Sequence, residues 1–257
     1  MALRDQTDLG GTAETFLTTR WSLIEGIQRK PDPQRAMIGM LLERYWRPVY
    51  CYLRRTGHDN EQAKDLTQGF FHEVVLNRRL IERADPSKGR FRSFLLHALK
   101  QYVIDQRRSG GGQSTISPGK LVSLEIADLP PLPQTIYRSS PEECFLYAWK
   151  AAMLDQTLAK VQDDCLSCGQ QTHWQIFQEG LVAPILEGTK PPPLKDLCRR
   201  YGVASEKTAS NMIITVKRRF QRTLREQLRS TVRSEAEADE ELQDFLQTWH
   251  FGAQHRD

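Results

Sequence analysis

The sequence lacks several features that define large classes of protein. It has no run of eighteen apolar residues and no apolar signal core at its N-terminus, so we expect no membrane insertion and a cytoplasmic location. Its five cysteines are an odd and unevenly spaced set, which favours reduced thiols over a disulfide framework. No segment alternates apolar and polar residues as a strand does. These absences indicate an all-α protein.

Signatures of catalysis and of cofactor binding are also missing. The glycine run Gly110–Gly112 has neither a preceding strand nor a following lysine, so it does not resemble a phosphate-binding loop. Cys165 and Cys168, with His173 nearby, supply fewer than the four ligands that a structural zinc needs, which favours free thiols. The remaining histidines are scattered along separate predicted helices. We therefore expect no enzymatic activity, no cofactor and no metal.

The charge of the chain is distributed unevenly. The net charge is only +4, yet residues 35–108 carry 15 Lys and Arg against 8 Asp and Glu, and residues 194–233 carry 11 against 3. Residues 142–193 sum to −4, and the tail 234–257 sums to −6. Two basic blocks on either side of a linker suggest two contacts on one polyanion. For either block taken alone, a solvated helical surface is the alternative.

Breaks in helical periodicity divide the chain. A glycine run followed by several prolines predicts a linker over residues 109–141, between helical blocks at 35–108 and 142–232. Residues 1–34 form an N-terminal arm. The acidic tail, residues 233–257, is equally compatible with a docked amphipathic helix and with a frayed end. We predict an all-α fold of two helical domains joined by a flexible Gly/Pro linker, the second containing a helix-turn-helix.

Three helices are predicted in the first block. Apolar residues recur at three- and four-residue steps from Ile38 to Leu53, where Pro48 is expected to kink or split the helix. A second helix, from about Asn60 to Leu80, has a polar side formed by Glu61, Asp65, Gln68 and His72. A third begins near Phe91 and ends at Arg108.

The most informative stretch of the sequence runs from Leu194 to Leu224. It predicts a short helix, a turn at Gly202, where glycine allows a positive φ, and a long helix that starts near Ser205. The side of the long helix that is expected to face the core is formed by Ala209, Met212, Ile213, Val216 and Phe220. It also carries a row of basic residues. Such a pair sets its second helix in the major groove of DNA, with the basic side chains on phosphates.

Three motifs follow one another in the first block. Residues 42–50 read Leu-Glu-Arg-Tyr-Trp-Arg-Pro-Val-Tyr, residues 63–68 read Ala-Lys-Asp-Leu-Thr-Gln, and residues 89–95 read Gly-Arg-Phe-Arg-Ser-Phe-Leu. Together they resemble the first helix, the Asp-Leu-Thr-Gln signature and the minus-ten helix of bacterial extracytoplasmic-function sigma factors, which belong to the sigma-70 family. The helix pair at 194–224 then falls where that family has its minus-thirty-five reader.

The resemblance implies three groups of site residues. Docking on core RNA polymerase is implied for Asp65, Leu66, Thr67 and Gln68. Contact with minus-ten DNA is implied for Arg90, Arg92, Lys100, Gln101, Tyr102, Arg107 and Arg108. Minus-thirty-five DNA is assigned to the second helix of the pair, through Ser205, Glu206, Lys207, Thr208, Ser210, Asn211, Arg218, Arg219 and Arg222.

Two positions depart from the family pattern. Gln101 stands where the family has an asparagine, and Ala204 stands where a small hydroxyl residue usually opens the reader helix, so Ser205 is expected to be the N-cap. The predicted function is that of a sigma factor that binds core RNA polymerase and promoter DNA, with an anti-sigma factor as a further candidate partner. The alternatives are a stand-alone helix-turn-helix regulator and, less favoured, a nucleic-acid enzyme.

Overall fold

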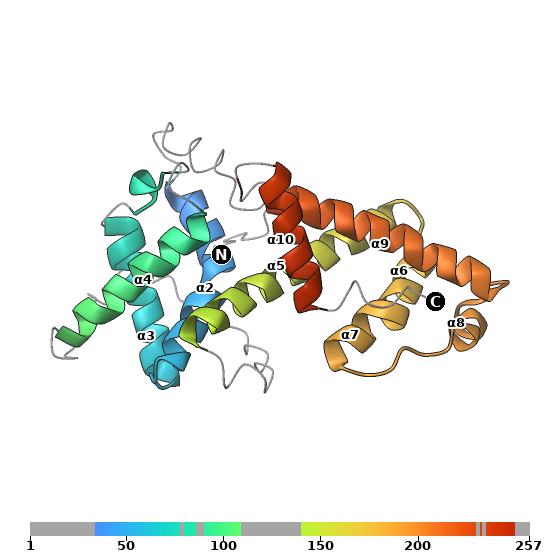
Figure 1. Cartoon of the computed structure of the whole chain (residues 1–257), viewed down its shortest axis with the longest axis horizontal. Helices are drawn as coiled ribbons and strands as arrows, with labels where there is room; N and C mark the ends of the chain where they lie inside the picture. The colour runs from blue at the N-terminus through green and yellow to red at the C-terminus, as the bar shows by residue number, and fades with distance from the viewer. Residues whose placement is uncertain are drawn as a thin grey trace, which may run out of the picture.

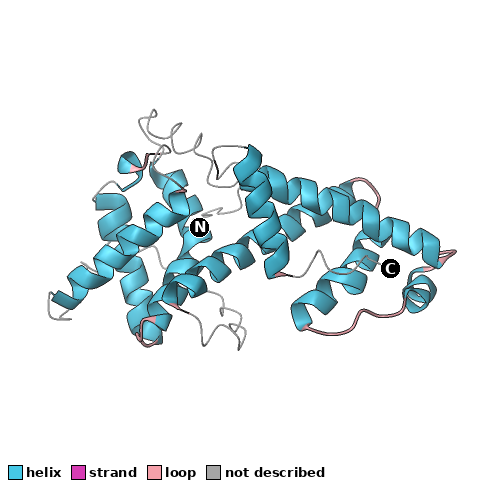
Figure 2. Ribbon diagram, viewed as in Figure 1, coloured by secondary structure: helices cyan, strands magenta, loops and turns pink. Residues whose placement is uncertain are grey.

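The computed structural model describes residues 34–77, 80–85, 90–108, 140–229, 232 and 235–249. Every regular element in these ranges is helical, as predicted (Figure 2). None of the helices in this part of the chain is both long and apolar enough to cross a bilayer. The predicted arm and linker lie outside the described residues, except Gln34 at the end of the arm and residues 140–141 at the end of the linker.

The first block contains the helical elements α2 (Gln34–Arg55), α3 (Asn60–Phe70), η2 (Phe71–Asn77), η3 (Leu80–Arg83) and α4 (Phe91–Arg108). The start of α3 is fixed by a capping box, in which Asp59 Oδ1 accepts from the Gln62 backbone N–H at 2.8 Å and Gln62 Oε1 accepts from the Asp59 N–H at 3.2 Å. Pro48 does not split α2, which continues to Arg55. Burial of Tyr45 and Val49 around the proline offsets the lost backbone hydrogen bond.

The second block contains the helical elements α5 (Pro141–Ser167), α6 (Gln171–Phe177), η6 (Gln178–Val182), α7 (Ala183–Glu187), α8 (Leu194–Tyr201) and α9 (Glu206–Arg229). A second capping box starts α5: Ser140 Oγ accepts from the Glu143 N–H, and the Glu143 carboxylate accepts from the Ser140 N–H. Pro141 occupies the first turn, where no hydrogen bond is lost.

The helix α5 connects the two blocks. Its N-terminal half packs against α2 and its C-terminal half against α6 and α9, so it extends from one end of the molecule into the other (Figure 1). Phe145 stacks on Tyr45 of α2 with ring centroids 6.5 Å apart. Farther along, Thr157 Oγ1 lies 2.9 Å from Gln227 Oε1 of α9. Buried side chains of both blocks belong to one hydrophobic cluster, and the division into two domains stays a prediction.

Two cysteines meet in the interface of α2 and α5. Cys51 and Cys144 are both buried, and the Cys144 thiol donates to the backbone carbonyl of Cys51 at 3.6 Å. The hydrogen bond with Cys144, followed by burial, raises the pKa of Cys51. The Cys51 thiol is therefore neutral, as a small side chain in an apolar interface should be.

The acidic tail forms a docked helix, α10 (Glu235–Thr248). It crosses beside α5 and α9 near the middle of the molecule (Figure 1). Ala238 and Phe245 are fully buried in the contact. Of the two readings of the tail that the sequence left open, the structure therefore has the amphipathic helix.

The packing of α5 on α2 predicts a large stability loss in the variant Phe145→Ala. This ring is fully buried, so its removal should lower the free energy of unfolding by about 3–5 kcal/mol. Urea unfolding followed by circular dichroism measures the change. Asp163→Ala, an exposed substitution on the same helix, should change stability by less than about 0.5 kcal/mol. A similarly small effect of Phe145→Ala would contradict the α2–α5 interface.

Candidate nucleic-acid interface

The helices α8 and α9 form the helix-turn-helix that the sequence predicts. Gly202 ends α8 in the left-handed conformation, with φ of 65°, and the Val203 N–H donates to the Cys198 carbonyl at 2.9 Å. Ser205 Oγ then accepts from the Thr208 N–H at 3.1 Å, which confirms Ser205 as the N-cap of α9. The turn is therefore held by local hydrogen bonds on both sides.

The inward face of α9 is also confirmed. Ala209, Ile213, Val216 and Phe220 are buried, and Met212 is half-buried at the edge of this stripe. Phe220 lies against Phe177 of α6, with ring centroids 6.4 Å apart. This stripe fixes how far α9 rotates about its own axis, and so which residues face solvent.

The element η6 anchors α8 to the same core. Glu179 accepts hydrogen bonds from the Tyr201 hydroxyl and from Arg200. The bond to Glu179 raises the pKa of Tyr201, because the neutral phenol is the donor. Gly180 lets η6 approach closely, since a Cβ there would lie 3.1 Å from Leu197 Cδ1. The orientation of the helix pair is thus determined by apolar packing and by the hydrogen bonds of Glu179 with α8.

Most residues predicted to read the minus-thirty-five element lie on the outer face of α9. Those that are exposed are Ser205, Glu206, Lys207, Thr208, Asn211, Arg218 and Arg222, and Ser210 is half-buried. Glu206 to Asn211 occupy the first turns of the helix, and the two arginines follow farther along. A helix that enters a groove with its N-terminal end forward would present these groups in that order.

Arg219 differs from the other arginines of α9. Its guanidinium donates to Cys165 Sγ at 3.1 Å and to Gln170 Oε1 at 2.9 Å, across to the end of α5 and the loop after it. Burial raises the pKa of Cys165, an effect that the neighbouring Arg219 opposes. Arg219 therefore joins α9 to α5 in this structure and does not share the exposed surface of Arg218 and Arg222.

The exposed surface of α4 is a stripe that runs the length of the helix. The residues Ser93, His97, Gln101, Ile104 and Arg108 recur at three- and four-residue steps and are all exposed, with Arg107 beside them. Arg107 Nη2 also reaches the Thr56 carbonyl at 3.5 Å. Three of the residues predicted to contact minus-ten DNA, Gln101, Arg107 and Arg108, lie on this surface.

Two other predicted minus-ten residues have different surroundings. Tyr102 is only 1% exposed and packs edge-on against Phe70, with ring centroids 5.7 Å apart, so it presents no ring face for a base. Lys100 forms an ion pair with Glu142 of α5 at 2.7 Å. This pairing raises the pKa of Lys100 and lowers the pKa of Glu142.

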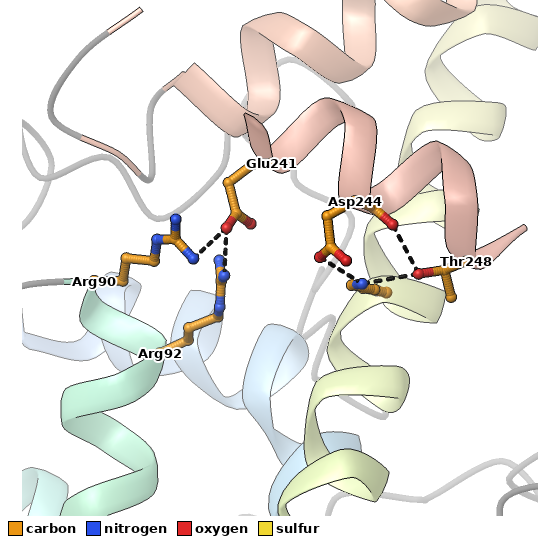
Figure 3. Close-up of polar contacts among 6 residues, drawn as sticks. Arg90, Arg92, Glu241, Asp244 and Thr248 are labelled. Carbon is orange, nitrogen blue, oxygen red and sulfur yellow. Dashed lines mark hydrogen bonds and ion pairs between the residues drawn. The ribbon is translucent and has the colours of Figure 1, made fainter. Parts of the chain in front are cut away.

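Arg90 and Arg92, at the start of α4, point toward the acidic helix α10 (Figure 3). Both form ion pairs with the carboxylate of Glu241, Arg92 at 2.8 Å. The sequence reasoning did not single out Glu241. Its spacing from Ala238 and Phe245, three and four residues away, places it on the buried stripe of α10 and is the signal that marks it as a partner for a buried cation.

The outer face of α3 is polar, as predicted. Asp65 is exposed and Gln68 is half-buried, whereas Leu66 packs against the core and is half-buried. Thr67 is fully buried, and its hydroxyl donates to the Ala63 carbonyl at 2.6 Å. The structure therefore presents Asp65 and Gln68 to a partner, while Leu66 and Thr67 hold the helix in place.

Comparison with known proteins identifies the first block. Residues 41–112 match the family model of sigma-70 region 2, from Leu41 within α2 through α4 and the four residues beyond it. No curated protein and no solved structure gives a significant match. The chain carries a sigma-70 region 2 domain, the part of sigma factors that binds RNA polymerase and recognises promoters. The match is thus to a domain of sigma factors, which are non-enzymatic proteins of transcription initiation.

The contacts of Arg219 predict that it acts on stability more than its neighbours do. Arg219→Ala should lower the free energy of unfolding by about 1–3 kcal/mol, because Gln170 and Cys165 lose a half-buried hydrogen-bond donor. Arg218→Ala, which removes an exposed charge one residue away, should change it by less than about 0.5 kcal/mol. Thermal and urea unfolding of the two variants compare them directly. Equal effects would show that the inward contacts of Arg219 do not form.

Proposed function

We propose that this chain is a sigma factor of the extracytoplasmic-function type. The main support for this proposal is the order of the two parts along the chain. A sigma-70 region 2 domain is followed by a helix-turn-helix whose second helix is exposed and basic. In this proposal α8 and α9 form a region 4-like unit within residues 142–232. A stand-alone regulator would need only the helix pair, whereas the region 2 domain favours a partnership with core RNA polymerase.

The proposed contacts divide among three surfaces. The outer face of α3, centred on Asp65 and Gln68, docks on core polymerase. The exposed stripe of α4 meets the opened minus-ten strand, where Arg107 and Arg108 supply charge and Gln101 supplies an amide for an unstacked base. The first turns of α9 meet base edges of the minus-thirty-five element, and Arg218 and Arg222 meet phosphates. An anti-sigma factor remains a further predicted partner.

Charge reversal on α3 tests the docking surface. Asp65→Arg should abolish binding to core polymerase, because Asp65 is exposed on the polar face and a basic partner helix would be repelled. Helical content and melting temperature should be unchanged. Glu187→Arg, an exposed reversal at the end of α7, is the control and should bind normally. Pull-down with purified core enzyme gives the answer, and retained binding by Asp65→Arg would remove α3 from the interface.

Two groups of substitutions on α9 test the readout of sequence. Lys207→Ala and Asn211→Ala should change which upstream element is preferred, with a cost of ~1–3 kcal/mol at a contacted base. Arg218→Ala and Arg222→Ala should weaken all sequences alike and reduce the salt slope by roughly one unit for each lost phosphate contact. Binding-site selection with each holoenzyme compares them. Uniform loss of affinity in both groups, without a change in preferred sequence, would show that α9 is not the reader.

A further inference from the structure

The acidic helix α10 contacts three other helices of the chain through ion pairs. It carries six acidic residues, Glu235, Glu237, Asp239, Glu240, Glu241 and Asp244. From this one helix, ion pairs reach α4 through Glu241 and α5 through Asp244 (Figure 3). Further ion pairs reach α9 through Asp239 and Glu235. Its position between these elements brings a negatively charged surface to Arg90 and Arg92, which the family resemblance assigns to minus-ten DNA.

The contact with α4 is the most buried of the three. Arg92 is 7% exposed and Glu241 is 4% exposed, and their atoms Nη2 and Oε1 lie 2.8 Å apart. The Arg92 guanidinium also lies over the ring of Trp149 on α5, with Cζ 4.4 Å from the centroid. Arg90 binds the same carboxylate oxygen. The two arginines at the start of α4 therefore share one carboxylate, and α10 covers Arg92.

The other contacts hold α10 against α5 and α9. Lys150 Nζ lies 2.7 Å from Asp244 Oδ2 and 2.8 Å from Thr248 Oγ1. Arg225 binds Asp239 through two hydrogen bonds, at 2.7 and 3.2 Å. The planar, bidentate geometry of the second pair makes it stronger than an ordinary surface ion pair. With Phe245 buried below, the helix is fixed by both apolar and ionic contacts.

A phosphate of DNA needs the same donors that Glu241 occupies. Glu241 holds Arg92 Nη2, and Arg92 is only 7% exposed, so a phosphate cannot reach this guanidinium in the docked geometry. The other acidic side chains of α10 would also repel a nucleic-acid backbone that approached α4. While α10 is docked, Arg90 and Arg92 are thus withheld from the opened minus-ten strand.

We propose that α10 is an autoinhibitory helix that occupies the minus-ten surface at Arg90 and Arg92 until it undocks. The inference rests on the proposed function, because it adds Arg90 and Arg92 to the minus-ten contacts proposed for α4 and assigns a regulation to them. Undocking would free both arginines without disturbing the helix pair, since α10 follows α9 in the chain and the buried stripe of α9 packs on α6. The apparent affinity for DNA then depends on the fraction of molecules in which α10 is undocked.

The substitution Glu241→Gln in the full-length chain tests this inference. It removes the charge that holds Arg90 and Arg92 and keeps the shape of the side chain. Affinity for a fluorescein-labelled, mixed-sequence single-stranded DNA, measured by anisotropy, should rise about tenfold if roughly one molecule in ten is undocked in the parent chain. Glu240→Gln is the matched control, because it removes the same charge from the neighbouring, exposed position.

A second variant covers the case in which Glu241→Gln perturbs folding. Asp239→Asn with Asp244→Asn weakens the anchors on α9 and α5 but keeps Glu241. Arg225 is partly exposed and keeps Glu235, and Lys150 keeps its hydrogen bond to Thr248. Because α10 is then held less tightly, the variant should bind the same DNA more tightly and show less hydrogen-exchange protection over residues 235–249. Unchanged affinity in a folded Glu241→Gln protein, or in the double variant if the first does not fold, would overturn the inference.

Binding to core polymerase separates this inference from the proposed function. If the parent chain and Glu241→Gln both bind core enzyme and the variant alone binds DNA more tightly, both proposals hold. If both chains bind core enzyme and bind DNA equally, autoinhibition is wrong and the sigma factor assignment stands. If neither binds core enzyme in the pull-down, the proposed function is wrong, whatever the DNA affinity of the variant.

Discussion

The structure depends on the two-sided burial of α5. Near its N-terminal end the buried residues include Phe145 and Trp149, and toward its C-terminal end they include Val161 and Cys165. A helix with apolar residues on more than one face cannot bury all of these residues against a single partner. The N-terminal half therefore packs on α2 of the region 2 domain, and the C-terminal half packs on α6 and α9. This double contact places the helix-turn-helix relative to the region 2 domain.

The position of α5 also creates the site where α10 docks. Trp149 supplies the ring on which Arg92 lies, and Lys150, the next residue, supplies the cation for Asp244. A buried guanidinium without an anion would be costly, because desolvation of a charge is repaid only by a well-placed partner. Glu241 is that partner. The apolar packing of α5 and the ionic docking of α10 are thus parts of one arrangement.

The proposed DNA surfaces differ in how available they are. The first turns of α9 and the outer stripe of α4 are exposed, so they need no rearrangement to meet DNA. Arg90 and Arg92 are engaged by α10, and Arg219 is engaged by Cys165 and Gln170. The seven arginines that the sequence assigns to DNA therefore have different roles in the structure. Arg107, Arg108, Arg218 and Arg222 are exposed, and the other three hold helices together.

Local features of the sequence were enough to predict much of the fold. Gly202 and Ser205 delimit the turn of the helix pair because positive φ and side-chain capping are properties of one or two residues. The inward stripe of α9 and the polar face of α3 follow from helical periodicity in the same way. Pro48 shows the limit of local rules. Its propensity to interrupt a helix was outweighed by burial of neighbours that pack on other elements.

The sequence by itself determined the helices, their exposed and buried faces, and the motifs that identify region 2. Only the tertiary structure decided which charged residues are free. Arg92 and Glu241 are separated by 149 residues, and no local sequence pattern predicts that they pair. Tyr102, which the family resemblance places among the minus-ten residues, is buried against Phe70. The reason is that periodicity reports one helix at a time, whereas the partner of a buried charge is set by how separate helices pack.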